Sequence, residues 1–400
     1  MKLLLPKFIS GPAIAALSVV LISGCSDSSN PPSSSSSNVN FDADAMITNL
    51  VDNVIVAGYS DLNTKAADLI AAVTALDTIT NNANMSAAQQ AWVNARAPWE
   101  SGEGFIFGPV DSLGVDPAID SWPLNTSDLQ TFLTANPTAT QTDVENASDD
   151  VRGYHAMEWL LFGDGIADNE KDSSELVAAE SNYLVALSDA YKAQTQALID
   201  AWTVDFNGQG PYADQAKSPG PSKAYGSDLA VVEEFIGGIV GIVAEVGEGK
   251  IPDPFTDNIG TADTSKVESQ YSWNSLTDFH DNIGSVLDMY TGIRQFDVLS
   301  DTLSDSNNGL YSFVLAHDSV LADRVYDEII AVLDAIALID GDNDTSTTEI
   351  TDPINQIPFR QAILVADGRI RIQAAIDALV VLQATIENDV AGLLTKTDFM

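Results

Sequence analysis

Apolar residues recur along this 400-residue chain with the spacing of amphipathic helices. The first stretch already shows the i, i+3, i+4, i+7, i+8 pattern that places side chains on one helix face, through Ile47, Leu50, Val51, Val54 and Ile55. The same period continues from Leu62 to Leu76, and further helices are expected over 178–202, 227–247, 274–292, 317–338 and 357–394. Sustained alternation of apolar and polar residues is missing, so the pattern predicts an all-α fold.

Residues 206–227 interrupt the helical pattern with many Gly, Pro and Ser residues. This composition is typical of a domain boundary. We therefore expect two helical-bundle domains, 41–205 and 228–400, packed side by side. A second irregular stretch, 98–125, is too long and too aromatic for a plain connector, and such loops are often functional or packed over a site.

Two helix starts can be predicted from capping residues. The sequence SAAQ at 86–89 has the capping-box form and predicts the start of the helix that carries Trp92 and Arg96. Ser148 is the expected N-cap of the helix that carries His155, with Asp149 and Asp150 in its first turn.

Acidic residues greatly outnumber basic ones, with 58 Asp and Glu against 17 Lys and Arg, which gives a net charge of −41. This charge repels nucleic acid phosphates and anionic lipid headgroups, so we expect no nucleic acid partner. Most of these carboxylates are interpreted as a solvated surface, and the excess alone does not indicate a metal site.

The N-terminus has the pattern of a secretory signal. Lys2 and Lys7 precede the uncharged residues 8–24, and the chain's single cysteine, Cys25, follows in the lipobox-like sequence LISGC. Residues 1–25 are therefore predicted to be a lipoprotein signal with lipidation at Cys25, and the Ser-rich residues 26–40 a flexible tether. We expect a bacterial cell-envelope protein anchored to the membrane by this lipid. Ser26, directly after the cysteine, favours the outer membrane, facing the periplasm or the exterior.

The sequence GYHAMEWLLFG, residues 153–163, contains one of only three histidines. His155 and Glu158 are three residues apart, which places both side chains on one face of a helix. The pair can ligate one ion, the carboxylate can orient the imidazole, or a core histidine can simply be paired with a carboxylate. An HExxH zinc-protease motif is absent.

The other chemical candidates have simpler explanations. His280 lies among acidic residues, and it fits a ligand and a polar helix face equally well. His317 precedes Asp318 at an expected helix start, where capping is the simpler explanation. Residues 340–349 begin like a calcium loop, but Thr345 and Thr351 replace its glycine and its bidentate glutamate, so we expect an acidic interhelical loop. The sequence shows neither a phosphate-binding glycine loop after a strand nor a GxSxG motif.

Several segments together resemble the imelysin family, also known as the M75 peptidases. They are 92–110, 116–124, 153–163 and 267–292, and Gly153, His155 and Glu158 match the family's GxHxxE motif. The resemblance covers essentially all of 41–400. It implies a bacterial envelope protein with two helical bundles and the motif at the interface between them.

The resemblance also implies which residues form the site. Its metal ligands are expected to be His155, Glu158, Glu103 and Glu268, with Arg96, Glu100, Gly153, Ser272 and Asp278 around them. Arg96 would neutralise surplus carboxylate or bind an anion in a bidentate manner. One imidazole with several carboxylates suits iron, manganese or zinc better than a thiolate-preferring ion. We expect a divalent metal, iron first and zinc as the alternative.

Three functions follow as hypotheses. The first is metal binding for iron uptake or regulation, with an iron-transport component as a partner. The second is a metallopeptidase, in which Glu158 would be the general base. The third is binding of a peptide, sugar or porphyrin, which exposed Trp99, Trp122 or Trp159 would favour.

Overall fold

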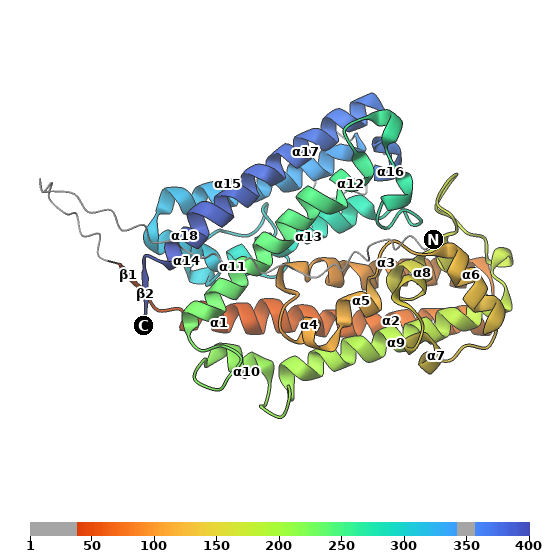
Figure 1. Cartoon of the computed structure of the whole chain (residues 1–400), viewed down its shortest axis with the longest axis horizontal. Helices are drawn as coiled ribbons and strands as arrows, with labels where there is room; N and C mark the ends of the chain where they lie inside the picture. The colour runs from red at the N-terminus through yellow and green to blue at the C-terminus, as the bar shows by residue number, and fades with distance from the viewer. Residues whose placement is uncertain (1–37, 342–356) are drawn as a thin grey trace, which may run out of the picture. The chain divides into compact units, whose positions relative to one another are not determined.

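The predicted all-α class is confirmed in a computed structural model that describes residues 38–341 and 357–400. Within these residues the structure has one small sheet, which was not predicted: β1, Val39–Phe41, pairs in parallel with β2, Thr397–Phe399. This pairing ties the first described residues to the end of the chain (Figure 1). Residues 38–400 form one compact unit. The division into two domains at 206–227 stays a prediction, and that segment contains a short helix, α10, Tyr212–Lys217.

The first group of helices comes from the N-terminal half of the chain. Helix α2 packs along both α3 and α9, and α8 packs against α3 and α9 (Figure 1). The bounds are α1 Asp44–Asn49, α2 Ala57–Thr78, α3 Asn82–Glu100, α4 Pro109–Leu113, α5 Val115–Ile119, α6 Thr126–Ala135, α7 Gln141–Glu145, α8 Gly153–Phe162 and α9 Ala178–Thr203.

The second group comes from the C-terminal half. Its helices α11, α13, α15 and α17 pack on one another, and α13 also packs on α3 (Figure 1). The bounds are α11 Asp228–Ala244, α12 Pro252–Phe255, α13 Ser275–Thr291, α14 Leu310–His317, α15 Ser319–Ala337, α16 Phe359–Ala362, α17 Ala366–Ala384 and α18 Ala391–Leu394. The contact between α13 and α3 brings the two halves together at the candidate site.

Several helix ends differ from the predicted ones. Helix α3 begins at Asn82 with Asn81 as its cap, so the predicted start at SAAQ is wrong, because Asn81 already accepts the N–H of Asn84 one turn earlier. Ser148 precedes the 3₁₀ turn Asp149–Val151 rather than α8, which starts only at Gly153. His317 ends α14, and Asp318 caps α15 by accepting two backbone N–H groups.

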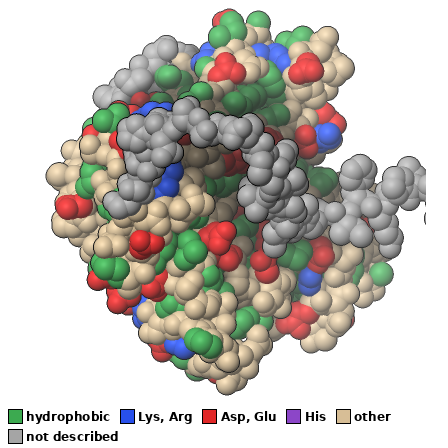
Figure 2. All heavy atoms as spheres, turned by 60° about the vertical axis from the view of Figure 1, so that its left-hand side comes forward, with side chains coloured by type: hydrophobic (Ala, Val, Ile, Leu, Met, Phe, Trp, Pro, Cys, Tyr) green, Lys and Arg blue, Asp and Glu red, His purple; other side chains and the backbone are tan. Residues whose placement is uncertain are grey.

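Some predictions fall outside the described residues. These are the signal with Cys25, the tether up to residue 37, and residues 342–349 of the acidic loop. Within the described ranges, no helix is both long enough and apolar enough to cross a membrane. Acidic side chains are scattered over the face that Figure 2 shows, which fits a solvated acidic surface.

Candidate metal centre

Arg96 lies at the centre of a buried cluster of carboxylates. It projects from the last turns of α3, and its side chain has no solvent exposure. Its guanidinium pairs with Asp120 and lies 2.6 Å from Glu100, 2.7 Å from Glu268 and 3.3 Å from Asp278. These four partners come from α3, the 98–125 stretch, the segment before α13, and α13 itself.

His155 faces the same cluster from α8. Its Nδ1 lies 3.0 Å from Glu158 Oε2, and the two form a hydrogen bond. Its Nε2 points the other way, 3.3 Å from Asp120 Oδ1 and 4.0 Å from Glu268 Oε1. Neither contact has hydrogen-bond geometry, so Nε2 is a buried ring nitrogen without a hydrogen-bond partner.

Glu158 is fully engaged by its surroundings. Its Oε1 accepts the backbone N–H of Tyr271 at 2.9 Å, and both the backbone N–H and the hydroxyl of Ser272 at 2.7 and 2.8 Å. The segment before α13 can aim both N–H groups at one oxygen because it turns sharply at Ser269 and Trp273, which have positive φ. Glu158 therefore holds the His155 ring in one orientation.

Gly153 allows α8 to begin close to Asp120. Its φ is +77°, and a Cβ atom at this position would lie 2.5 Å from the backbone oxygen of Ile119. Only glycine avoids both the unfavourable dihedral and this clash. The glycine of the GxHxxE motif thus places His155 beside the residue that follows Ile119.

Lys250 lies among carboxylates next to the cluster around Arg96. Lys250 ends the π-helical segment Glu245–Lys250, and its Nζ lies 2.9 Å from Glu103, 3.3 Å from Glu268 and 3.5 Å from Glu100. Asn282 of α13 donates from its amide nitrogen to Glu100 Oε2 at 2.7 Å and to Glu103 Oε2 at 3.1 Å.

Burial and charge shift the pKa values of these groups strongly. Burial raises the pKa of Glu100 and of Glu103 well above the usual range, more than Arg96 and Lys250 lower them. Burial also raises the pKa of Asp278 to about 6. Burial opposes protonation of His155, but its contacts with Asp120 and Glu158 outweigh this and raise its pKa to about 9.

These shifts predict that the metal-free protein loses stability as the pH rises. His155 and Asp278 have folded-state pKa values above their unfolded values, so the folded state binds more protons than the unfolded state. Asp278 contributes this stability below pH 4 and loses it up to about pH 6. His155 contributes about 3 kcal/mol below pH 6.5 and loses it by about pH 9.

Denaturant unfolding in a chelator, from pH 5.5 to 9, measures this loss. His155→Gln is expected to flatten the slope between pH 6.5 and 9. Equal slopes for the wild type and His155→Gln would contradict the assignment. High salt in a parallel series separates this effect from repulsion between surface charges.

The residues that the sequence predicted for the site lie together. Glu158 contacts both His155 and Ser272. Arg96 contacts Glu100, Glu268 and Asp278, and Glu103 contacts Lys250. Among the residues that the structure describes, two groups can each offer three ligand atoms within 4.8 Å of one another: Asp120, His155 and Glu268, and Glu100, Glu103 and Asp120. Glu158 belongs to neither group. Asp120 and Lys250 were not predicted, although Asp120 lies in the segment 116–124 that carries the resemblance.

The tryptophans do not form an open binding surface. Trp99 is buried, and its Nε1 donates to Asp120 Oδ2 at 2.6 Å. Trp122 is half-buried, and its ring lies 4.5 Å from the His155 ring, edge to face. Trp159 is half-buried beneath Lys171. Trp122 therefore covers the His155 side of the cluster.

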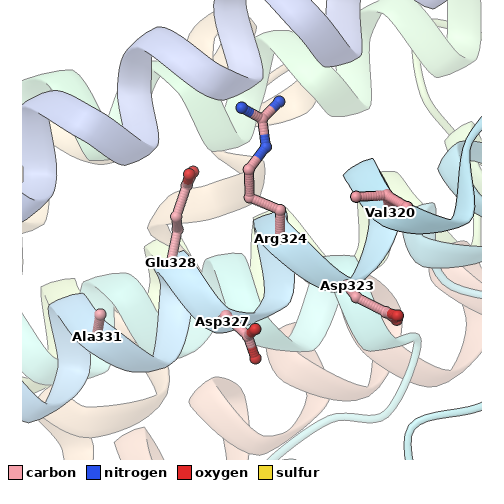
Figure 3. A pocket seen from close by; sticks show the side chains of 6 residues that line it. All are labelled: Val320, Asp323, Arg324, Asp327, Glu328 and Ala331. Atoms are coloured by element: carbon pink, nitrogen blue, oxygen red, sulfur yellow. The ribbon is translucent and has the colours of Figure 1, made fainter.

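A groove along α15 is lined by residues of that helix alone. Unlike the cluster around Arg96, it does not bring side chains from several elements together. Figure 3 shows Arg324 and Glu328 on one side of the helix and Asp323 and Asp327 on the other. Arg324 already pairs with Asp389. The groove therefore does not gather its carboxylates around one point.

Comparison with known proteins identifies the family. The sequence model of the imelysin (peptidase M75) family matches residues 55–386. The chain belongs to the imelysin family. Among its relatives is iron-regulated protein A of Synechococcus elongatus, 32% identical over 265 residues, which are 65% of this chain and 68% of that protein.

Solved imelysin-like structures agree with the fold. The crystal structure of an iron-regulated protein A precursor from Parabacteroides distasonis matches with a TM-score of 0.73 and 26% identity, over 88% of this chain and 94% of that chain. An imelysin-like protein from Psychrobacter arcticum matches with a TM-score of 0.64, over 90% of this chain and 98% of that one. At 15% identity, the second likeness concerns the fold alone.

Proposed function

We propose that this imelysin-family protein binds a divalent metal ion, iron first and zinc as the alternative, through Asp120, His155 Nε2 and Glu268. In this proposal Glu158 orients the histidine, and Glu103 belongs to the adjacent carboxylate group. The function served is iron uptake or regulation.

One observation carries the proposal: Nδ1 of His155 is held by Glu158 while Nε2 is buried without a hydrogen-bond partner and faces two carboxylates. A histidine that ligates a metal usually donates its other ring N–H to a carboxylate, which fixes the tautomer and the ring orientation. The HxxE spacing places Glu158 in this supporting position, because residues three apart share one helix face.

The charge balance supports a cation in the same place. Six carboxyl groups lie in the cluster, on Glu100, Glu103, Asp120, Glu158, Glu268 and Asp278. Arg96, Lys250 and a protonated His155 offset only half of them. A buried excess of negative charge is unfavourable unless it is protonated or paired, and a divalent ion would supply the pairing.

The ligand chemistry and the relatives together favour iron. One imidazole with carboxylates suits iron and zinc, whereas a thiolate-preferring ion would need the cysteine ligands that the chain lacks beyond Cys25. The relatives from Synechococcus elongatus and Parabacteroides distasonis are both described as iron-regulated.

The geometry favours binding over peptide hydrolysis. A metallopeptidase needs a general base that can take a proton from a metal-bound water. Glu158, the base that this alternative assigns, is buried, and both of its oxygens are already in hydrogen bonds.

Metal content measured by elemental mass spectrometry tests the proposal. The purified protein is stripped with a chelator and reloaded with Fe(II) without oxygen, or with Zn(II). We expect close to one ion per wild-type chain. Asp120→Asn combined with His155→Ala should weaken binding at least about 100-fold, and Glu158→Gln about 10- to 100-fold, as for other supporting residues. His317→Gln is the matched control. Equal metal content in the wild type and the double variant would refute the proposal.

We further propose that Cys25 anchors the protein to the cell envelope by a lipid, at the outer membrane, where an iron-transport component would be its partner. The signal pattern of residues 1–25 supports this. Membrane fractionation compares the wild type with Cys25→Ser. Retention of the variant in the membrane fraction would contradict a lipid anchor.

A further inference from the structure

The feature that the proposed metal site leaves unexplained is Lys250. Its side chain is 7% exposed, and its ammonium group contacts Glu100, Glu103 and Glu268. Burying a lysine is costly unless opposite charges surround it. Here three carboxylates lie within 3.5 Å of its Nζ and compensate the charge. Lys250 therefore carries a positive charge inside the carboxylate cluster.

The ammonium lies next to a second set of oxygens that fits a cation. Glu100, Glu103 and Asp120 can each bring one oxygen within 4.8 Å of the others, and Asp120 also belongs to the set with His155 and Glu268. A carboxylate has two oxygens and about four lone-pair directions, so one Asp can serve two neighbouring cations. Carboxylate-bridged pairs of metal ions use this arrangement, with ions about 3.5–4 Å apart.

The backbone fixes where the ammonium can lie. Lys250 is the last residue of a π-helical segment that continues α11, and Pro252 begins α12 two residues later. Short π-helical segments are rare and frequently lie at functional sites. Asn282 donates to the same two residues, Glu100 and Glu103, and its buried Oδ1 has no hydrogen-bond partner.

We propose that the Lys250 ammonium occupies the second of two adjacent cation positions and thereby restricts the site to one metal ion. This inference rests on the proposed metal site of Asp120, His155 and Glu268. Without the ammonium, Glu100 and Glu103 would lose one cationic partner while keeping their contacts with Arg96 and Asn282, and a second ion would take its place beside the first, with Asp120 as the shared ligand. The lysine thus determines how many metal ions the protein carries.

Metal stoichiometry tests this role. The whole protein and its Lys250→Met and Lys250→Arg variants are loaded with Mn(II), desalted and analysed by elemental mass spectrometry and by electron paramagnetic resonance. We expect one ion per chain in the wild type and in Lys250→Arg, with the six-line signal of isolated Mn(II). Lys250→Met should bind two ions per chain and show the broadened signal of an exchange-coupled pair.

The outcomes separate the two proposals. One ion on the wild type and one on Lys250→Met would overturn the role of Lys250 alone, whereas no ion on either protein would overturn the metal site itself. Thermal unfolding provides a second measurement in case Lys250→Met folds poorly. Mn(II) should raise the Tm of Lys250→Met more than that of the wild type. A variant that does not fold even with Mn(II) would also overturn the proposal, because the ion would have failed to replace the ammonium.

Discussion

Replacing Arg96 with methionine is expected to lower the free energy of unfolding by about 3–5 kcal/mol at pH 7.5 in the absence of metal. Arg96 is completely buried and contacts four carboxylates, two of them, Glu100 and Asp278, without any solvent exposure. Methionine retains much of the apolar stem but removes the charge. The carboxylates would then have to become protonated or remain buried and unpaired.

A pH series with two comparison variants shows whether charge is the cause. The loss of unfolding free energy in Arg96→Met should be smaller at pH 5, because protonated carboxyl groups are not destabilised by the missing guanidinium charge. Arg96→Lys should cost less than Arg96→Met, since it keeps the charge but loses the fork that reaches several partners. Arg324→Met is the matched control, since Arg324 pairs with Asp389 at the surface and its removal should cost at most about 1 kcal/mol. A cost of that size for Arg96→Met would mean that the cluster is already neutral.

Helices could be predicted from the sequence where their apolar stripes are long. The expected helix at 274–292 is α13, Ser275–Thr291, and the expected helix at 178–202 is α9, Ala178–Thr203. The ends were less predictable, because a capping pattern such as SAAQ occurs inside a helix as readily as at its start. Asn81 caps α3 in the structure, and a polar residue of this kind is common enough in the sequence to carry little information.

The site could be predicted only in part, for a physical reason. His155 and Glu158 are three residues apart, so helix geometry alone places them together. The other predicted residues came from the family resemblance. Asp120 is the C-cap of the short helix α5, and Lys250 follows a glycine at the end of a helical run. No periodic signal marks either residue, and both reach the cluster through long-range packing. The role of Glu158 could not be derived either, because its partners Tyr271 and Ser272 are more than a hundred positions away.

Replacing Gly153 with alanine is expected to cost about 2–4 kcal/mol of stability and to weaken metal binding at the same time. The new Cβ would meet backbone atoms of Ile119, at 2.5 Å from the oxygen, and alanine would also have to adopt a φ of +77°. The clash cannot be relieved by a side-chain rotation, so α8 and the Ile119–Asp120 segment must separate. That movement takes Asp120 away from both His155 and Arg96.

The coupling between stability and metal binding distinguishes this explanation from a general loss of packing. Unfolding by denaturant and metal titration are measured on the same preparations. Gly284→Ala is the matched control, since Gly284 lies within α13 and a Cβ added there would meet no neighbouring atom within 4 Å. Alanine at this position should be neutral or stabilising by up to about 1 kcal/mol. If Gly153→Ala lost stability but kept wild-type metal affinity, the close approach at Ile119 would serve the fold and not the position of Asp120. If Gly153→Ala lost neither stability nor metal affinity, the close approach at Ile119 would not explain the glycine of the motif.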